Sequence, residues 1–171
     1  MAITKTVNFA ALRNDFPLLR KSDNGKPLVY LDSGASAQKP SVVMKAMDDF
    51  YTKNYANIHR GIYELSARAT KMYENVRHVV ADFIQAERAD EIVFLRGTTE
   101  AINLVADTMS RSWRPGDEVI LSEMEHHSNI VPWYLLKERL GIVLKVVPVT
   151  DDGSLDMDAY RAFFSERTKM V

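Results

Sequence analysis

The sequence predicts an α/β fold with a mostly parallel sheet and helices on both of its faces. Two observations lead to this prediction. Several short segments are almost continuously apolar, as strands buried on both faces usually are. Segments with helical periodicity separate them, and a helix between two strands is the usual right-handed crossover of a parallel sheet. Ligands bind such sheets beyond the carboxyl ends of the strands, so chemistry is expected at the strand-to-helix turns.

Four elements are expected in the first half of the chain. A short helix is predicted around residues 9–19, although Pro17 weakens its end. A strand is predicted at 27–32 (PLVYLD), and after a loop of small residues a helix is predicted over 40–51. A polar connector, residues 54–61, precedes a long amphipathic helix. Its apolar stripe, which indicates core or a subunit interface, comprises Ile62, Leu65, Ala69, Met72, Val76, Val79 and Phe83.

In the second half, predicted strands and helices alternate. The strands are 91–97 (EIVFLRG), 117–123 (DEVILSE) and 142–149 (IVLKVVPV). The helices are 98–113, 129–140 and 155–166. A further strand begins at KMV, and because the chain stops there we expect it to be truncated.

Size and composition favour a globular chain with a substantial core. It has 171 residues, of which 46% are apolar and 26% charged. The net charge of -1 indicates no basic surface for nucleic acid or an anionic membrane. No apolar run reaches the ~20 residues of a membrane span and no signal core is present, so we expect a cytoplasmic protein. The absence of cysteine excludes disulfides, thiolate metal ligands and a cysteine nucleophile within these residues.

The turn Gly97-Thr98-Thr99-Glu100 has two interpretations. Free N–H groups and the positive end of the helix dipole favour a bound phosphate, and the two threonine hydroxyls add donors. Alternatively, Thr98 or Thr99 caps the helix, with Glu100 in its first turn. The chain has neither a P-loop lysine at this turn nor a G-x-G-x-x-G pattern, so a dinucleotide or P-loop site is not supported.

Two of the four histidines, His126 and His127, follow the next strand. A metal site is disfavoured because adjacent side chains point apart and neither H-E-x-x-H nor a cysteine accompanies them. A structural loop role remains open, as does an imidazole that packs on a flat ligand or acts as an acid or base. Ser128 or Asn129 is expected to cap the following helix.

Two loops in the first half admit a binding role beside a plainer one. The small residues 33–37 (SGASA) let backbone approach a ligand closely, and a simple surface turn explains them equally. In the connector, the guanidinium of Arg60 is suited to bind a carboxylate through two hydrogen bonds. A solvated loop is the simpler interpretation of that segment.

Four stretches occur in a specific order: YLDSGASAQKP (30–40), HRGIYELSARAT (59–70), FLRGTTEAINLVA (94–106) and EMEHHSNIVPW (123–133). Together they resemble the N-terminal part of the pyridoxal-phosphate-dependent cysteine desulfurases of the class V aminotransferase family. Within these, they are similar to the SUF-type group, which includes selenocysteine lyases. The resemblance runs from about Asp15 to the last residue. It implies the N-terminal part of the type I aminotransferase-like fold, with 1–29 as an arm of the small domain and 30–171 as part of the cofactor-binding large domain.

The same resemblance implies a homodimeric enzyme that uses pyridoxal 5′-phosphate. Such an enzyme takes sulfur from L-cysteine, leaves alanine, and holds the sulfur as a persulfide for a sulfur-acceptor protein of iron–sulfur cluster assembly. Alternatives are a selenocysteine lyase, another class V aminotransferase or, from a different class, a non-enzymatic binding module.

Residue by residue, the resemblance assigns Thr98 and Thr99 to the phosphate-binding turn, with Thr99 as the side-chain contact. It assigns His126 to the catalytic histidine whose ring stacks on the pyridine. The residues that it places near the substrate are Gly34, Ala35, His59 and Arg60. The family's cofactor-bonded lysine, pyridinium-pairing aspartate and persulfide cysteine lie beyond residue 171, and Lys39 is not that lysine. We therefore expect the chain as it stands to be inactive.

Overall fold

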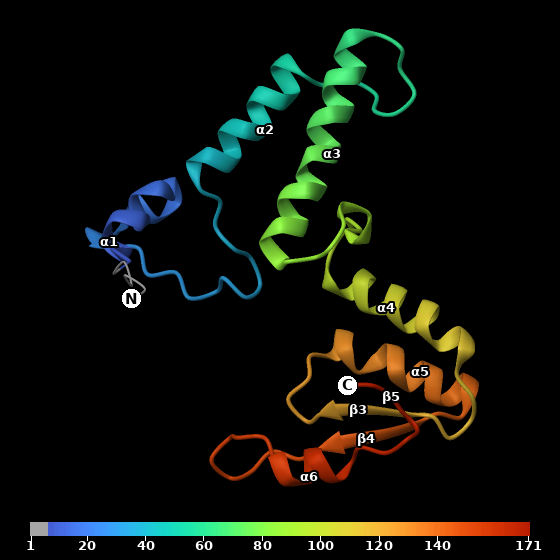
Figure 1. Ribbon diagram of the computed structural model, residues 1–171. Helices are drawn as coiled ribbons and strands as arrows, with labels where there is room; N and C mark the ends of the chain where they lie inside the picture. The colour runs from blue at the N-terminus through green and yellow to red at the C-terminus, as the bar shows by residue number, and fades with distance from the viewer. Residues whose placement is uncertain (1–6) are drawn as a thin grey trace, which may run out of the picture. The chain divides into compact units, whose positions relative to one another are not determined.

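The computed structural model describes residues 7–171, and the chain forms two compact units, Met1–Ile92 and Val93–Val171 (Figure 1). The first unit is built mainly of helices, and the second contains a parallel sheet with helices, so the predicted α/β class is confirmed. None of the helices within residues 7–171 combines the length and apolar character that a membrane crossing requires. The predicted division into an arm, 1–29, and a large domain, 30–171, stays a prediction.

The elements of the first unit are α1 (Phe9–Leu12), η1 (Arg13–Asp15), η2 (Pro17–Arg20), β1 (Ser22–Asp23), β2 (Lys26–Pro27), α2 (Ser41–Lys53), α3 (Glu64–Ile84) and η3 (Ala89–Glu91). The helices α2 and α3 occur where the sequence predicts them. The helix predicted over 9–19 is instead one short α-helical turn followed by two 3₁₀ segments. The break falls at Phe16, whose backbone is extended, as expected for the residue before a proline.

The strands predicted at 27–32 and 91–97 are absent, and both predictions were wrong. Beyond Pro27, residues 28–32 belong to no strand, and Leu31 is 91% exposed. Residues 92–97 likewise belong to no strand. An apolar segment becomes a strand when a neighbour pairs with its N–H and C=O groups. Apart from the N–H of Leu28, which donates to the carbonyl oxygen of Lys21 at 3.2 Å, neither segment pairs its backbone with a neighbouring strand among the described residues. The apolar pattern alone therefore misled the prediction.

The apolar stripe of α3 is not core within the first unit. Of its predicted positions Ala69 is fully buried, whereas Phe83 is 87% exposed and Val79 is 58% exposed. This exposure concerns the described residues alone, so both interpretations that the sequence left open, core of the complete protein and subunit interface, stay predictions.

The second unit is built around a three-stranded parallel sheet of order β4-β3-β5. Its elements are α4 (Thr98–Met109), η4 (Ser110–Ser112), β3 (Glu118–Ser122), η5 (His127–Asn129), α5 (Val131–Leu140), β4 (Val143–Val147), α6 (Met157–Ala162) and β5 (Thr168–Met170). Figure 1 shows α5 and α6 on opposite faces of this sheet. Helices on both faces explain why the strands are apolar almost throughout.

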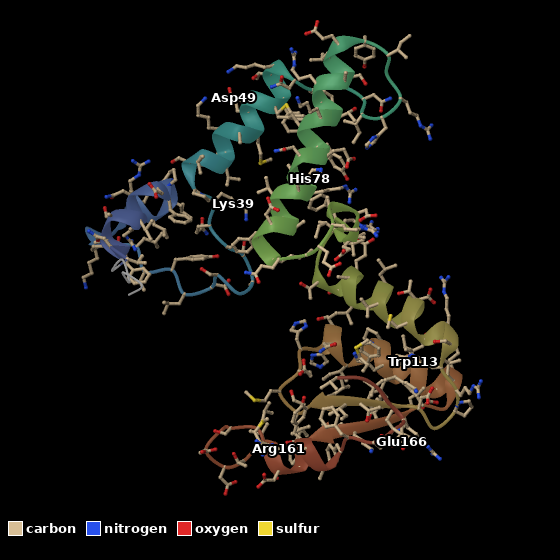
Figure 2. The ribbon with its side chains drawn as sticks, viewed as in Figure 1. Lys39, Asp49, His78, Trp113, Arg161 and Glu166 are labelled. Atoms are coloured by element: carbon tan, nitrogen blue, oxygen red, sulfur yellow. The ribbon has the colours of Figure 1, made fainter. Side chains whose placement is uncertain are left out.

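The core of the second unit lies between the sheet and the helices α4 and α5. Val119 and Leu121, alternate residues of β3, point to this face and pack with Trp133 of α5 and Ala106 of α4. The ring of Trp113, labelled in Figure 2, stacks on that of Trp133 with the centroids 6.3 Å apart. This packing fixes α5 against the strand whose carboxyl end leads into the histidine turn.

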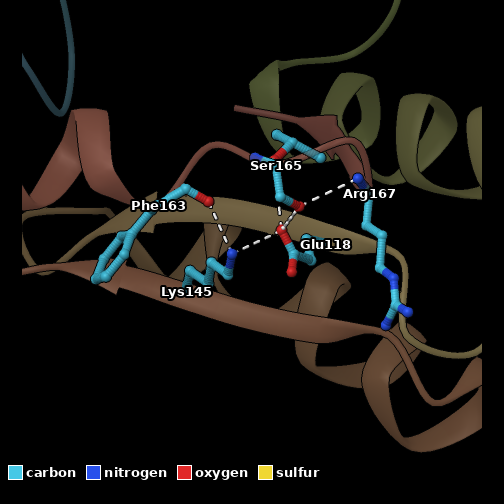
Figure 3. A network of polar contacts seen from close by, with 6 residues as sticks. Glu118, Lys145, Phe163, Ser165 and Arg167 are labelled. Atoms are coloured by element: carbon cyan, nitrogen blue, oxygen red, sulfur yellow. Dashed lines mark hydrogen bonds and ion pairs between the residues drawn. The ribbon is translucent and has the colours of Figure 1, made fainter.

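The other face of the sheet holds a polar network, shown in Figure 3. Lys145 of β4 donates both to Glu118 of β3 and to the carbonyl oxygen of Phe163, each at 2.7 Å. Ser165 also donates to Glu118, at 2.6 Å. These hydrogen bonds, that from Lys145 first, lower the pKa of the Glu118 carboxyl. The network ties the strands to the end of α6, because Phe163 is the residue that ends this helix.

Candidate functional site

The amino end of α4 presents hydrogen-bond donors without a protein cap. Gly97 is the N-cap residue, and Thr98 and Thr99 are the first two residues of the helix. The prediction that one of these threonines caps the helix was therefore wrong. In the part of the chain that the structure describes, no side chain accepts a hydrogen bond from their N–H groups, and both residues are exposed. Because the helix dipole adds a positive potential here, this end is suited to an anion.

The backbone conformation at Gly97 does not require a glycine. Its φ of 165° is extended, a conformation that any residue adopts. A Cβ atom built on it would meet nothing within 4 Å. A residue without a side chain at this position would also let a ligand approach the backbone closely.

Glu100 closes the same turn from the first turn of the helix. Its carboxylate accepts the backbone N–H of Arg96 at 2.8 Å and pairs with the Arg96 guanidinium at 3.0 Å. The hydrogen bond from the Arg96 side chain, followed by that from its backbone, lowers the pKa of Glu100. Glu100 therefore stays ionised, and its pairing with Arg96 reduces its repulsion of an anion beside Thr98 and Thr99.

His126 is held at the start of η5 by its own ring. Its Nδ1 atom accepts the backbone N–H of Ser128 at 3.1 Å and lies 2.9 Å from the Ser128 hydroxyl. A neutral ring that accepts through Nδ1 carries its hydrogen on Nε2, so this contact selects one tautomer and orients the ring. The expectation that Ser128 or Asn129 caps α5 was wrong, because Ile130 is the N-cap residue and caps through no side chain.

The two histidine rings lie edge to face. Their centroids are 6.2 Å apart and their planes meet at 88°. A flat ligand parallel to one ring therefore meets the other edge-on, and the two histidines cannot both stack on it. Within residues 7–171 no group of three or more His, Cys, Asp and Glu side chains is placed to hold a metal ion.

A series of side-chain hydrogen bonds stabilises the turn that carries His126 and His127, called here the histidine turn. Ser122, at the end of β3, donates to Glu125 at 2.7 Å, and Asn129 donates to the other oxygen of Glu125 at 2.9 Å. The indole N–H of the buried Trp133 donates to Asn129 at 3.0 Å. The bonds from Asn129 and Ser122 lower the pKa of the Glu125 carboxyl. These hydrogen bonds were not predicted from the sequence, although the spacing of four between Glu125, Asn129 and Trp133 could have indicated them.

The turn at Thr98 and the histidine turn belong to neighbouring elements of the second unit. The helix α4 packs against η5. Ala101 and Ile102 of α4 line one cavity of about 240 Å³ together with Asn129 of η5. Thr98, Thr99 and His126 thus lie on elements that contact each other.

The four residues predicted near the substrate belong to the first unit. Gly34 and Ala35 lie in an exposed turn in which the N–H of Ala35 donates to Asp32 at 3.2 Å. The hydroxyl of Tyr30 donates to the carbonyl oxygen of Ser36 and closes this turn. Lys39, labelled in Figure 2, donates to the backbone of the same loop, at Ala37. The other two predicted residues, His59 and Arg60, are exposed in the connector between α2 and α3.

Comparison with known proteins finds one family and a consistent set of relatives. The sequence pattern of the family "aminotransferase class-V" matches residues 29–171. The cysteine desulfurase of Dickeya dadantii is 56% identical over 161 residues, which cover 94% of this chain and 39% of the relative. The chain therefore spans about two-fifths of the length of the curated relatives that it matches.

Two solved structures share the fold at substantial identity. The apo structure of a cysteine desulfurase from Thermococcus onnurineus NA1 aligns with a TM-score of 0.82 and 36% identity, covering 94% of this chain and 38% of that one. The cysteine desulfurase CsdA of Escherichia coli, in its S-sulfonic acid form, aligns with a TM-score of 0.76 and 38% identity. That alignment covers 96% of this chain and 40% of CsdA.

Proposed function

The chain belongs to the aminotransferase class-V family, and from this premise we propose that it is the N-terminal part of a pyridoxal-phosphate-dependent cysteine desulfurase of the SUF type. The observation that carries the proposal is the similarity of nearly the whole chain to cysteine desulfurases, both in sequence and in fold. The complete protein removes sulfur from L-cysteine and leaves alanine. The sulfur passes, as an enzyme persulfide, to an acceptor protein of iron–sulfur cluster assembly.

The amino end of α4 fits the phosphate of the cofactor. Thr98 and Thr99 offer backbone N–H groups and hydroxyls that have no protein partner among the described residues. A doubly charged phosphate accepts such donors through charge-assisted hydrogen bonds of about 1.5–3 kcal/mol each. Thr99 is assigned the side-chain contact. The ion pair of Arg96 with Glu100 reduces the repulsion between the Glu100 carboxylate and the anion.

His126 fits the aromatic partner of the cofactor ring. Pyridoxal phosphate, when bound, supplies an electron sink for the negative charge that develops on the substrate. The His126 ring stacks on the pyridine, a contact worth about 0.5–1.5 kcal/mol beyond the buried area. The N–H of Ser128 donates to Nδ1 and so favours the tautomer with its hydrogen on Nε2, and this atom would donate a proton or a hydrogen bond at the reacting face.

The first unit supplies residues for the substrate. Gly34 and Ala35, which carry little or no side chain, let the 32–36 turn approach L-cysteine closely. Arg60 is exposed and its planar guanidinium matches the geometry of a carboxylate. We assign Arg60 to the substrate carboxylate and His59 to the same segment.

The complete protein is proposed to act as a cytoplasmic homodimer. The exposed apolar stripe of α3 supports the dimer, because contiguous exposed apolar surface commonly marks a site of protein–protein contact. The pair Val79 and Phe83 is the most exposed part of the helical stripe.

The proposal is tested with the complete protein loaded with pyridoxal phosphate. L-Cysteine should be converted to alanine and persulfide sulfur in equal amounts, measured by amino-acid analysis and by sulfide release with a thiol reductant. If no alanine forms, the proposed function is wrong. A strong preference for selenocysteine, measured as the ratio of kcat/KM values, would reassign the enzyme as a selenocysteine lyase.

A further inference from the structure

The side chain of Glu125 connects the two ends of the histidine turn. One oxygen of its carboxylate accepts the hydroxyl of Ser122, the last residue of β3, at 2.7 Å. The other oxygen accepts the side-chain amide of Asn129, the last residue of η5, at 2.9 Å. These two contacts are called here the Glu125 bridge. His126, the residue directly after Glu125, lies between the two ends that the bridge joins.

Asn129 links this bridge both to His126 and to the core of the second unit. Its backbone N–H donates to the carbonyl oxygen of His126 at 2.7 Å. Its side-chain carbonyl accepts the indole N–H of Trp133, which is 3% exposed, at 3.0 Å. A displacement of Asn129 would therefore move the backbone of His126 as well as the side chain of Glu125. The position of the His126 backbone thus depends on the bridge.

The bridge requires an acceptor at both oxygens of Glu125. An ionised carboxylate only accepts hydrogen bonds, so it matches a hydroxyl and an amide that both donate. The bond from Asn129, followed by that from Ser122, lowers the pKa of Glu125, and the carboxylate is therefore ionised at neutral pH. A glutamine of the same shape keeps one acceptor oxygen but has an NH₂ group in place of the other. Glu125→Gln therefore separates the charge of the side chain from its shape.

The neighbouring carboxylate of Glu123 has a different role. It accepts the backbone N–H of Val149 at 2.8 Å, a residue that follows β4. Glu123 thus connects the histidine turn to the adjacent strand, whereas Glu125 connects the turn to itself. Because the two glutamates lie two residues apart, Glu123 is a matched control for the loss of a hydrogen-bonded carboxylate from this segment.

We propose that Glu125 is a positioning residue, whose carboxylate holds the histidine turn so that the ring of His126 meets the cofactor in one orientation. The part of this inference that concerns the cofactor rests on the proposed function. The part that concerns the turn rests on the contacts of Glu125 and Asn129 alone. Glu125 acts through the backbone of the turn and takes no part in proton transfer.

Hydrogen exchange of the complete protein without cofactor, followed by mass spectrometry on a peptide spanning residues 124–132, tests the turn. Glu125→Ala should speed exchange of the Asn129 amide, because the bond of this amide to His126 is no longer held by the bridge. Glu125→Gln should speed it less, and Glu123→Ala should leave it unchanged. Unchanged exchange in Glu125→Ala would overturn the inference.

The complete protein loaded with pyridoxal phosphate tests the effect on His126. Glu125→Ala should weaken the visible circular dichroism of the bound cofactor, which reports the orientation of its ring. It should also lower kcat for L-cysteine by up to about a hundredfold, as a displacement of a reacting group by about 1 Å does. KM should change far less, because no proposed substrate contact is removed. Glu125→Gln should be intermediate in both measurements.

Three results would separate the possible failures. Faster exchange in Glu125→Ala with unchanged dichroism and kcat would leave Glu125 a structural residue only and overturn the positioning role. Equal losses of dichroism in Glu123→Ala and Glu125→Ala would do the same, because any loosening of the segment would then suffice. If the unsubstituted protein does not act on cysteine, the proposed function is wrong, and exchange and dichroism alone decide the role of Glu125.

Discussion

The indole N–H of Trp133 donates to the side-chain carbonyl of Asn129 at 3.0 Å, and this bond joins the buried core of the second unit to the turn that carries His126. The side-chain amide of Asn129 donates to Glu125, and the hydroxyl of Ser122, at the end of β3, donates to the same carboxylate. The turn is therefore fixed at both ends, by a strand and by a helix. A ligand that stacks on His126 meets a ring whose support is already in place.

Asn129→Ala should destabilise the complete protein and loosen the histidine turn. It leaves the buried indole N–H of Trp133 without an acceptor, which costs roughly 1–3 kcal/mol. Thermal or denaturant unfolding measures the loss of stability. Asn103→Ala is the control, because Asn103 is exposed and donates to its own helix at Thr99. Equal losses in the two variants would contradict the supporting role of Asn129.

Substitutions at the two histidines should separate their roles. His126→Ala should lower cysteine desulfuration strongly and shift the visible absorbance of the cofactor, because both the stacked ring and its proton are lost. His126→Phe should restore the absorbance more than the rate, since it returns the ring without a titratable nitrogen. His127→Ala should mainly lower thermal stability. A cofactor spectrum that responds to His127→Ala and not to His126→Ala would reverse the assignment.

Thr99→Val should weaken cofactor retention more than it slows the fully loaded enzyme. The loss of one charge-assisted hydrogen bond, roughly 1.5–3 kcal/mol, corresponds to about a ten- to hundredfold fall in affinity. Dissociation of pyridoxal phosphate, followed by absorbance during dilution, measures this. Thr108→Val, at the other end of α4, serves as the control because its hydroxyl bonds within the helix, to Leu104. Identical cofactor dissociation in the two variants would leave Thr99 without a phosphate role.

Because of the hydrogen bonds of Glu118 with Lys145 and Ser165, the free energy of unfolding should decrease at acidic pH. The pKa of Glu118 in the folded chain is lowered from its ordinary 4.5 by Lys145 first and then by Ser165. A lowered carboxyl pKa contributes stability that is complete above the unfolded value and is lost as the pH falls through the folded value. Glu118→Gln should therefore lower stability near neutral pH and flatten its pH dependence below about 4.5.

Glu166→Gln is the control for that experiment, since Glu166 is exposed on the same unit and is labelled in Figure 2. Urea unfolding at a series of pH values between about 3 and 7 measures both variants. If Glu118→Gln kept the full acid dependence of the unsubstituted protein, the network would not be its source.

Sequence periodicity predicted the elements whose partners lie close along the chain. The helix α3, for example, follows from apolar residues at steps of three and four, and β3 follows from an apolar segment between two helical ones. The segments 28–32 and 92–97 look equally apolar but are not strands, because pairing depends on a neighbour that composition does not reveal.

The candidate site could be predicted only in part from the sequence. Residue types located the turns at Thr98 and His126, but the side-chain hydrogen bonds of the histidine turn, which join residues two to four apart, were missed. The capping predictions failed because Gly97 and Ile130 occupy the cap positions, so the nearby polar residues were free for other contacts. The N–H of His59 donates to Thr70, and the His59 ring contacts Glu74, from a backbone of positive φ at His59. The residue types of the connector did not predict this backbone conformation.

We propose that the turns at Thr98 and His126 hold pyridoxal phosphate in a cysteine desulfurase. A crystal structure of the complete protein with the cofactor bound would show whether they do. The phosphate should lie within hydrogen-bonding distance of the N–H groups of Thr98 and Thr99 and of the Thr99 hydroxyl, with the His126 ring parallel to the pyridine. A cofactor bound elsewhere, with the amino end of α4 open to solvent, would rule out these roles for Thr98, Thr99 and His126.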